Sequence, residues 1–259
     1  MMLVALRDIV HAVGMIPRGS EFEASDAVGE EMVRGGAARL ASMPLPDTAQ
    51  RNKTFAILAS GPSLTGDQIE TVRAWRECGE NRVVIAVCRT FFEAPWADHM
   101  YAADPNWWRH YGERVRSMFR GQAWTHRDNK VGATFGAKQM EVSNKPGLST
   151  TPGIIYSGGN SGYQAIGLAY HLGARRIVLL GFDMQATDGK THHHGDYPER
   201  NLVQNSPFAS WVNRFIILSA GLRRAGVVTI NATPTTALKC FTQQPLEVAL
   251  EFGGAPWDR

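Results

Sequence analysis

From residue 54 onward, short apolar runs alternate with longer segments in which apolar residues recur at helical spacing. The apolar runs are residues 54–59, 82–88, 99–104, 122–126, 175–183 and 226–232, and the helical segments are residues 65–77, 107–119, 161–172 and 208–224. Several of the runs are rich in β-branched residues at consecutive positions, which is typical of strands buried on both faces of a sheet. This alternation predicts an α/β fold with a Rossmann-like, doubly wound and mostly parallel sheet.

The first 43 residues follow a different pattern. Apolar and polar residues alternate at positions 3–10, a turn is expected at residues 17–19, and a brief helical pattern within residues 26–40 is closed by Gly35 and Gly36. These features predict a small β-rich N-terminal module. Residues 44–53 contain two prolines and several polar side chains, which favour a linker, and residues 54–259 then form the main domain.

Composition restricts the class of protein. A chain of 259 residues with 44% hydrophobic content is long enough for one sizeable domain and a small appendage. The net charge is +3, and the basic residues are spread along the chain rather than clustered. Charge alone therefore does not argue for nucleic acid as the partner, and a small anionic ligand would account for it equally well.

The three cysteines and the start of the chain bear on location. Three scattered cysteines are too few for a disulfide framework or a cysteine-based zinc site, which suits a reducing compartment. The first residues meet Arg7 and Asp8 before any long apolar run, so neither a signal peptide nor a membrane span is expected. We therefore expect a cytoplasmic protein.

A Gly-Pro-Ser sequence, residues 61–63, lies between an expected strand and an expected helix. In such a unit the first backbone amides of the helix point at whatever lies above the end of the strand, and a phosphate fits there. The simpler alternative is a strand-to-helix turn with a serine cap.

Three named motifs can be compared with this turn. The dinucleotide fingerprint matches only in part, because Ser63 stands where a glycine should let the backbone approach the pyrophosphate. The nucleophile elbow needs a glycine where Thr65 stands. The only Gly-Lys-Thr tripeptide, residues 189–191, has Met184 where a P-loop needs glycine. The turn is therefore not a nucleophile elbow, and residues 184–191 are not a P-loop.

A second glycine-rich stretch precedes the helix expected at residues 161–172. The small residues are Gly158, Gly159, Ser161 and Gly162. They would let a ligand approach the backbone, and Asn160 supplies an amide that can recognise a base or a sugar. The alternative is an ordinary loop.

Polar and ionisable residues are most concentrated at the end of the strand at 175–183 and in the loop after it. Its polar residues are Asp183, Asp188, Lys190, His192, His193, His194, Asp196 and Tyr197. Neighbouring side chains of an extended segment diverge, so at most His192 and His194 face the same way, where they could bind a metal. A solvated polar loop is the alternative.

These three loops, together with Cys88 and Arg89 after one strand and with Asp104, Pro105 and Asn106 after the next, follow apolar strands. The carboxyl ends of parallel strands meet at one edge of the sheet, which is where open α/β folds bind ligands. The sequence therefore predicts one ligand site built from all of these segments.

Four segments carry a resemblance to known proteins: ILASGPSL (57–64), GGNSGYQAIGLAYHLGARRIVLLGFDM (158–184), DGKTHHHGD (188–196) and GVVTINATPTTAL (226–238). They resemble the family that contains the archaeal 6-hydroxymethyl-dihydropterin pyrophosphokinases and the flagellin-glycosylation accessory proteins. They also resemble, more loosely, bacterial sialyltransferases that use a CMP-activated sugar. The similarity covers residues 54–241. The first 43 residues look instead like small modules encoded in phage and prophage genomes, which implies a phage origin and the host cytoplasm.

The sialyltransferase resemblance implies a nucleotide-sugar site. It places Gly61, Pro62 and Ser63 by the phosphates, Asn160 and Ser161 on the nucleotide, and Asp183 beneath it. The resulting nucleotide-binding candidates are Gly61, Pro62, Ser63, Cys88, Arg89, Asp104, Gly159, Asn160, Ser161 and Lys190, and the catalytic candidates are His192, His194, Asp183 and Asp196. One of the two histidines would act as general base on an acceptor hydroxyl. Met184 departs from the pattern, near the place of a tyrosine that supports the leaving phosphate, so Tyr197 substitutes or that role is absent.

The pyrophosphokinase resemblance implies ATP, Mg²⁺ held by Asp104 and Asp183, and a pterin hydroxyl as nucleophile. Asp188, Lys190 and Arg89 could supply further metal ligands and cationic clamps. Trp107 and Trp108 could stack on a flat ring, although burial on a helix face is the alternative that we prefer.

We expect a nucleotide-dependent transferase, with glycosyl transfer ahead of pyrophosphoryl transfer. A non-catalytic, virion-associated nucleotide-binding module stays open, with the N-terminal residues docking it to a partner. Transfer of a sugar to DNA is a further alternative, because five basic residues could form a surface facing DNA: Arg109, Arg114, Arg116, Arg120 and Arg127. The donor, the acceptor, the need for Mg²⁺ and the oligomeric state stay open.

Overall fold

The computed structural model describes residues 52–195, 197 and 207–251, together with five short strands near the start of the chain. These strands are β1 (Met2–Ala5), β2 (Ile9–His11), β3 (Gly14–Ile16), β4 (Glu21–Glu23) and β5 (Ala38–Leu40). Strands β4, β1 and β5 pair in an antiparallel sheet, and β2 pairs with β3. The brief helix expected before β5 and most of the expected linker lie outside the described residues.

The described part of the main domain contains one nine-stranded sheet in which every neighbouring pair is parallel. Its strands are β6 (Lys53–Leu58), β7 (Arg82–Val87), β8 (His99–Tyr101), β9 (Gln122–His126), β10 (Lys138–Ser143), β11 (Ile154–Tyr156), β12 (Ala174–Leu180), β13 (Val228–Asn231) and β14 (Thr242–Gln243). The α/β fold predicted from the sequence is confirmed.

The order of the strands creates one switch point. From β6 the chain moves outward through β7, β8, β9 and β10 to β11, and it then returns to place β12 on the other side of β6. The first and second halves of the sheet therefore separate at the β6–β12 pair. In open parallel sheets the crevice above such a pair is the usual place for a ligand.

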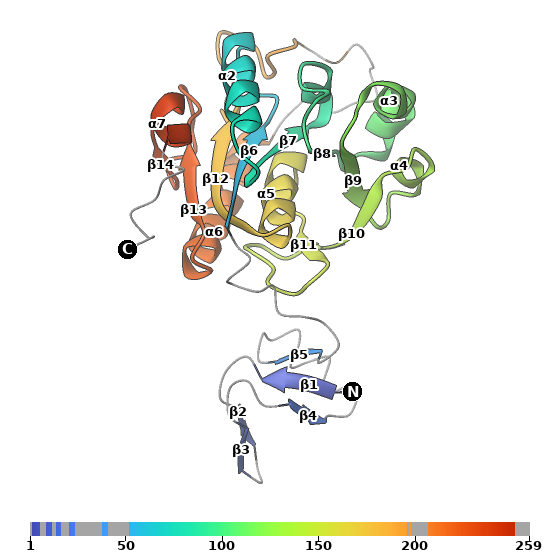
Figure 1. The fold of residues 1–259 in the computed structure, drawn as a ribbon, viewed down its shortest axis with the longest axis vertical. Helices are drawn as coiled ribbons and strands as arrows, with labels where there is room; N and C mark the ends of the chain where they lie inside the picture. Colours follow the sequence, from blue (N-terminus) through green and yellow to red (C-terminus); the bar gives the residue numbers. More distant parts are fainter. Residues whose placement is uncertain are drawn as a thin grey trace.

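Helices cover both faces of the sheet (Figure 1). On one face lie α2 (Gly66–Glu77), α3 (Pro105–Met118) and α7 (Leu246–Glu251), and on the other lie α5 (Ser161–His171) and α6 (Phe208–Arg224). Successive residues of a strand point to opposite faces, so Ala56 and Leu58 pack in the first core and Phe55 and Ile57 in the second. Two short elements, η2 (Cys88–Phe92) and α4 (Lys130–Thr134), complete the fold.

The helix ends follow local chemistry. A capping box starts α2, in which Thr65 Oγ1 accepts from the Gln68 amide and Gln68 Oε1 accepts from the Thr65 amide. After α5 the chain continues through Gly173, whose φ of 95° lies in the left-handed region that glycine adopts without strain. Both boundaries lie within two residues of those expected from the sequence.

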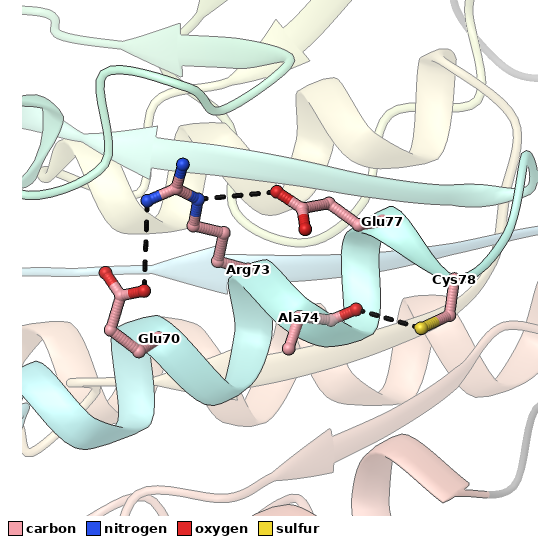
Figure 2. A network of polar contacts seen from close by, with 5 residues as sticks. All are labelled: Glu70, Arg73, Ala74, Glu77 and Cys78. Atoms are coloured by element: carbon pink, nitrogen blue, oxygen red, sulfur yellow. Dashed lines mark hydrogen bonds and ion pairs between the residues drawn. The ribbon is translucent and has the colours of Figure 1, made fainter.

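The exposed face of α2 carries a small polar network (Figure 2). Arg73 Nη1 lies 3.8 Å from Glu70 Oε2, and Arg73 Nε lies 3.4 Å from Glu77 Oε1. Separately, the Cys78 thiol donates to the Ala74 carbonyl. These groups are exposed, so the ion pairs contribute little to stability. None of the helices among the described residues is long and apolar enough to cross a membrane.

Candidate functional site

A cavity of about 540 Å³ lies at the carboxyl ends of strands β6 to β12. Each of these strands contributes at least one residue just after its end: Ser60, Cys88, Asp104, Asp128, Asn144, Ser157 and Asp183. The volume is typical of a small-molecule site, and the switch point between β6 and β12 lies within it. The predicted convergence of loops at one sheet edge is therefore what the structure contains.

Asp183 fastens the Gly-Pro-Ser turn to the end of β12. Its fully buried carboxylate accepts from the Ser63 amide at 3.0 Å and from the Ser63 hydroxyl at 2.9 Å. The Gly61 amide donates to the Gly181 carbonyl at 2.9 Å. Burial raises the pKa of Asp183, and the bonds from Ser63 oppose that rise. Asp183 therefore organises the turn, and it also lines the cavity.

The backbone amides of the turn itself, which precede the helix, are bonded within the protein and are not free for a phosphate. The amides of Gly61 and Ser63 are used inside the protein, and Pro62 has no amide hydrogen. Gly61 lines the cavity, whereas Pro62 and Ser63 are absent from its lining. A Cβ atom on Gly61 would collide with Asp183 Oδ2 and with the Gly181 carbonyl, so the close contact requires glycine.

The start of α5 presents hydrogen-bond donors to the cavity. Asn160 Oδ1 caps the helix by accepting from the Tyr163 amide at 2.9 Å, while Asn160 Nδ2 is buried and has no partner among the described residues. Asn160, Ser161 and Gly162 all line the cavity, as does Gly159. The first amides of a helix have no carbonyl partner within it, and they attract anions. The nucleotide-binding candidates of this segment are thus brought together.

The ends of β7 and β8 complete this side of the cavity. Cys88 has a left-handed φ of 52°, and burial raises its pKa to about 11, so its thiol stays protonated near neutral pH. Asp104 Oδ1 accepts from the Asn106 amide at 2.7 Å and caps α3. Trp107 and Trp108 are buried on α3, as the preferred alternative predicted, although Trp107 also forms part of the cavity wall.

The three histidines have different surroundings. His192 lines the cavity, and its Nδ1 lies 3.0 Å from Thr191 Oγ1. The His194 ring lies parallel to the His192 ring, with centroids 5.1 Å apart, but it is not part of the lining. His193 turns toward Glu93, with Nε2 at 3.6 Å from Oε1, and its amide donates to the Ser60 carbonyl.

A lowered pKa argues against His194 as the base. Burial, followed by the charge of Arg89 and the neighbouring histidines, lowers the pKa of His194 to about 3. Such an imidazole accepts a proton only weakly near neutral pH. His192 is therefore the better placed of the two predicted bases.

Three further candidates lie away from the cavity lining or outside the described residues. Lys190 is exposed in a tight turn, in which its amide and carbonyl bond to those of Thr187. Arg89 lies behind the lining, against His194. Asp196 lies outside the described residues.

The residues that are described do not form a protein-held metal site. No three His, Cys, Asp or Glu side chains among them are grouped to hold a metal ion. Both carboxylate oxygens of Asp183 accept from Ser63, and Asp104 caps α3. Asp104 and Asp183 nevertheless both line the cavity, and Mg²⁺ in nucleotide sites is commonly bound by one or two carboxylates together with phosphate oxygens and water, so the Mg²⁺ site stays a prediction.

Sequence reasoning missed several residues of the cavity lining. His126, Asp128, Asn144 and Gln164 line it, together with Trp211 of α6. Asn144 follows β10, whose six residues include few apolar ones and gave no strand signal. Asn144 was therefore not linked to the site.

Comparison with known proteins assigns no family. No protein-family model matches the sequence, and no curated protein matches it significantly.

Proposed function

We propose that the cavity binds a nucleotide and that the protein transfers a glycosyl group from a nucleotide-sugar to a hydroxyl acceptor. The observation that carries this proposal is the buried Asn160 Nδ2, which has no partner among the described residues and lies at the start of α5, in the lining that also holds His192. A buried donor without a partner costs free energy unless a ligand accepts from it.

The charge of the lining favours a donor with few phosphates. Among its described residues are Asp104, Asp128 and Asp183, and none is Lys or Arg. A triphosphate would have to be neutralised by cationic clamps or metal ions. One or two phosphates can accept hydrogen bonds at the start of α5, where the Ser161 and Gly162 amides have no partner within the helix.

His192 is the proposed general base. In the tautomer in which Nδ1–H donates to Thr191, the basic nitrogen is Nε2. As the acceptor oxygen bonds to the anomeric carbon, the bond from that carbon to the phosphate oxygen breaks, and its electron pair leaves with the nucleotide. The acceptor proton passes to His192 Nε2.

Two other functions remain as alternatives. Pyrophosphoryl transfer from ATP to a pterin-like alcohol would need Mg²⁺ or cationic clamps on the phosphates, and the described lining contains Asp104 and Asp183 but no Lys or Arg. A nucleotide-binding module without catalysis would use the same cavity and would bind nucleotide without turnover.

An Asn160→Asp variant separates ligand binding from folding. The aspartate oxygen can still accept from the Tyr163 amide, so the melting temperature should stay within about 2 °C of wild type. The variant lacks the Nδ2 donor, so we expect nucleotide affinity, measured by calorimetry, to fall at least about tenfold. Unchanged affinity would show that the ligand does not use this donor and would remove the main support for the proposal.

A further inference from the structure

Arg89 is held in an aromatic cage behind the cavity wall. Its guanidinium carbon lies 5.9 Å from the ring centroid of Phe92, 5.6 Å from that of Tyr111 and 5.7 Å from that of Tyr197. Such contacts attract a cation and restrict its movement. Arg89 is not itself a lining residue, but Tyr197 is, so the guanidinium lies directly behind the cavity wall.

The polar contact of Arg89 is with His194. Arg89 Nη1 lies 3.3 Å from His194 Nδ1. A guanidinium has donors and no acceptor, so Nδ1 must accept and the ring proton of His194 must be on Nε2. Arg89 therefore selects the neutral tautomer of His194 that carries its proton on Nε2. It also restricts rotation of the His194 ring about its side-chain torsion.

The His194 ring in turn supports His192. The two rings are inclined by only 13°, with centroids 5.1 Å apart, and the Tyr197 ring meets both edge-on at 5.3 Å and 5.0 Å. A ring packed on one face and one edge has few other orientations available. The orientation of His192 at the cavity wall thus depends on a neighbour that Arg89 holds.

The charges around His194 come from several elements. Arg89 and Glu93 face it from η2 and from the end of η2, and His192 and His193 precede it in its own loop. From α3, Tyr111 lies against Arg89, and Arg114 lies over the same Phe92 and Tyr111 rings. Cationic or ionisable basic groups outnumber Glu93 here, so a second proton on His194 would meet repulsion.

We propose that Arg89 and His194 are positioning residues for His192. Arg89 sets the tautomer and orientation of the His194 ring, and the face of that ring holds the His192 imidazole at the wall of the cavity. This inference rests on the proposed function, in which His192 is the general base. It assigns to Arg89 a role different from the nucleotide contact that the sequence suggested.

The test is a side-chain nitrogen NMR titration of the full chain labelled at histidine, from pH 8 to pH 5. In wild type we expect the His194 signals to show one neutral tautomer throughout. In Arg89→Met, which keeps an apolar stem and removes the donor and charge, His194 should populate both tautomers and begin to titrate within this range. Arg114→Met is the matched control, because it alters the same aromatic cage without contacting His194, and it should leave these signals unchanged.

A second variant covers the case in which Arg89→Met does not fold. His194→Asn keeps an acceptor for Arg89 but removes the supporting ring, so the His192 signals should broaden. The kcat for transfer should fall about 10- to 100-fold with unchanged nucleotide affinity. Unchanged His194 signals in Arg89→Met, or unchanged His192 signals and kcat in His194→Asn, would overturn the inference. If wild type transfers no sugar but the spectra change as expected, the proposed function fails and the positioning role stands.

Discussion

Replacement of Gly61 by alanine is expected to lower the free energy of unfolding by about 3 kcal/mol, which is at the upper end for overpacked sites. The added methyl group would collide with Asp183 Oδ2 and with the Gly181 carbonyl. Relief of that collision requires the Asp183 carboxylate to move away from Ser63, which leaves a buried charge with fewer hydrogen bonds. Chemical denaturation followed by circular dichroism measures the effect.

Gly66→Ala is the matched control for this prediction. Gly66 is the first residue of α2, and a Cβ atom there would meet nothing within 4 Å. Alanine favours helix, so we expect this variant to be about 0.5 kcal/mol more stable than wild type. Equal stabilities of the two variants would mean that the Gly61–Asp183 contact does not restrict the turn.

His192→Asn is expected to lower kcat by about 10²- to 10⁴-fold, the range for loss of a general base. The asparagine keeps a polar side chain of smaller size at the cavity wall, so nucleotide affinity should change by less than about threefold. Initial rates of nucleotide release in the presence of acceptor, together with calorimetric binding, separate the two effects.

His110→Asn provides the control for that loss. His110 lies on the exposed side of α3, outside the cavity lining, so its replacement should leave kcat within about twofold of wild type. If His192→Asn retained wild-type turnover, His192 would not be the base, and the proposed chemistry would need another proton acceptor.

The main elements of the fold could be predicted because burial gives their sequences recognisable apolar patterns. Residues 82–88 and 175–183 have the continuous apolar character of β7 and β12, which are covered on both faces. The edge of the sheet was not predicted. In β10 Met140 is the buried residue among mostly exposed or half-buried neighbours, and β11 has only three residues, too few to show a period.

The site was predicted only as far as local chemistry allows. Asn160 and His192 could be predicted from their residue types and from their positions in loops near the ends of apolar strands, and both line the cavity. The partner of Ser63 is Asp183, 120 residues later, so no local pattern could show that this aspartate accepts from the Ser63 amide and hydroxyl. The position of Arg89 behind the lining likewise depends on the rings of Phe92 in η2, Tyr111 in α3 and Tyr197 in the loop after β12.

The claim that the cavity at the switch point binds a nucleotide can be tested by ligand-dependent thermal unfolding. Purified protein would be heated with CMP, CDP, UDP, GDP, ATP and the matching nucleotide-sugars, each with and without Mg²⁺. We predict that a nucleoside monophosphate or diphosphate raises the melting temperature without Mg²⁺, by about 5 °C at a concentration one hundred times its Kd. Stabilisation by ATP with Mg²⁺ alone would favour pyrophosphoryl transfer, and no stabilisation by any nucleotide would contradict the claim.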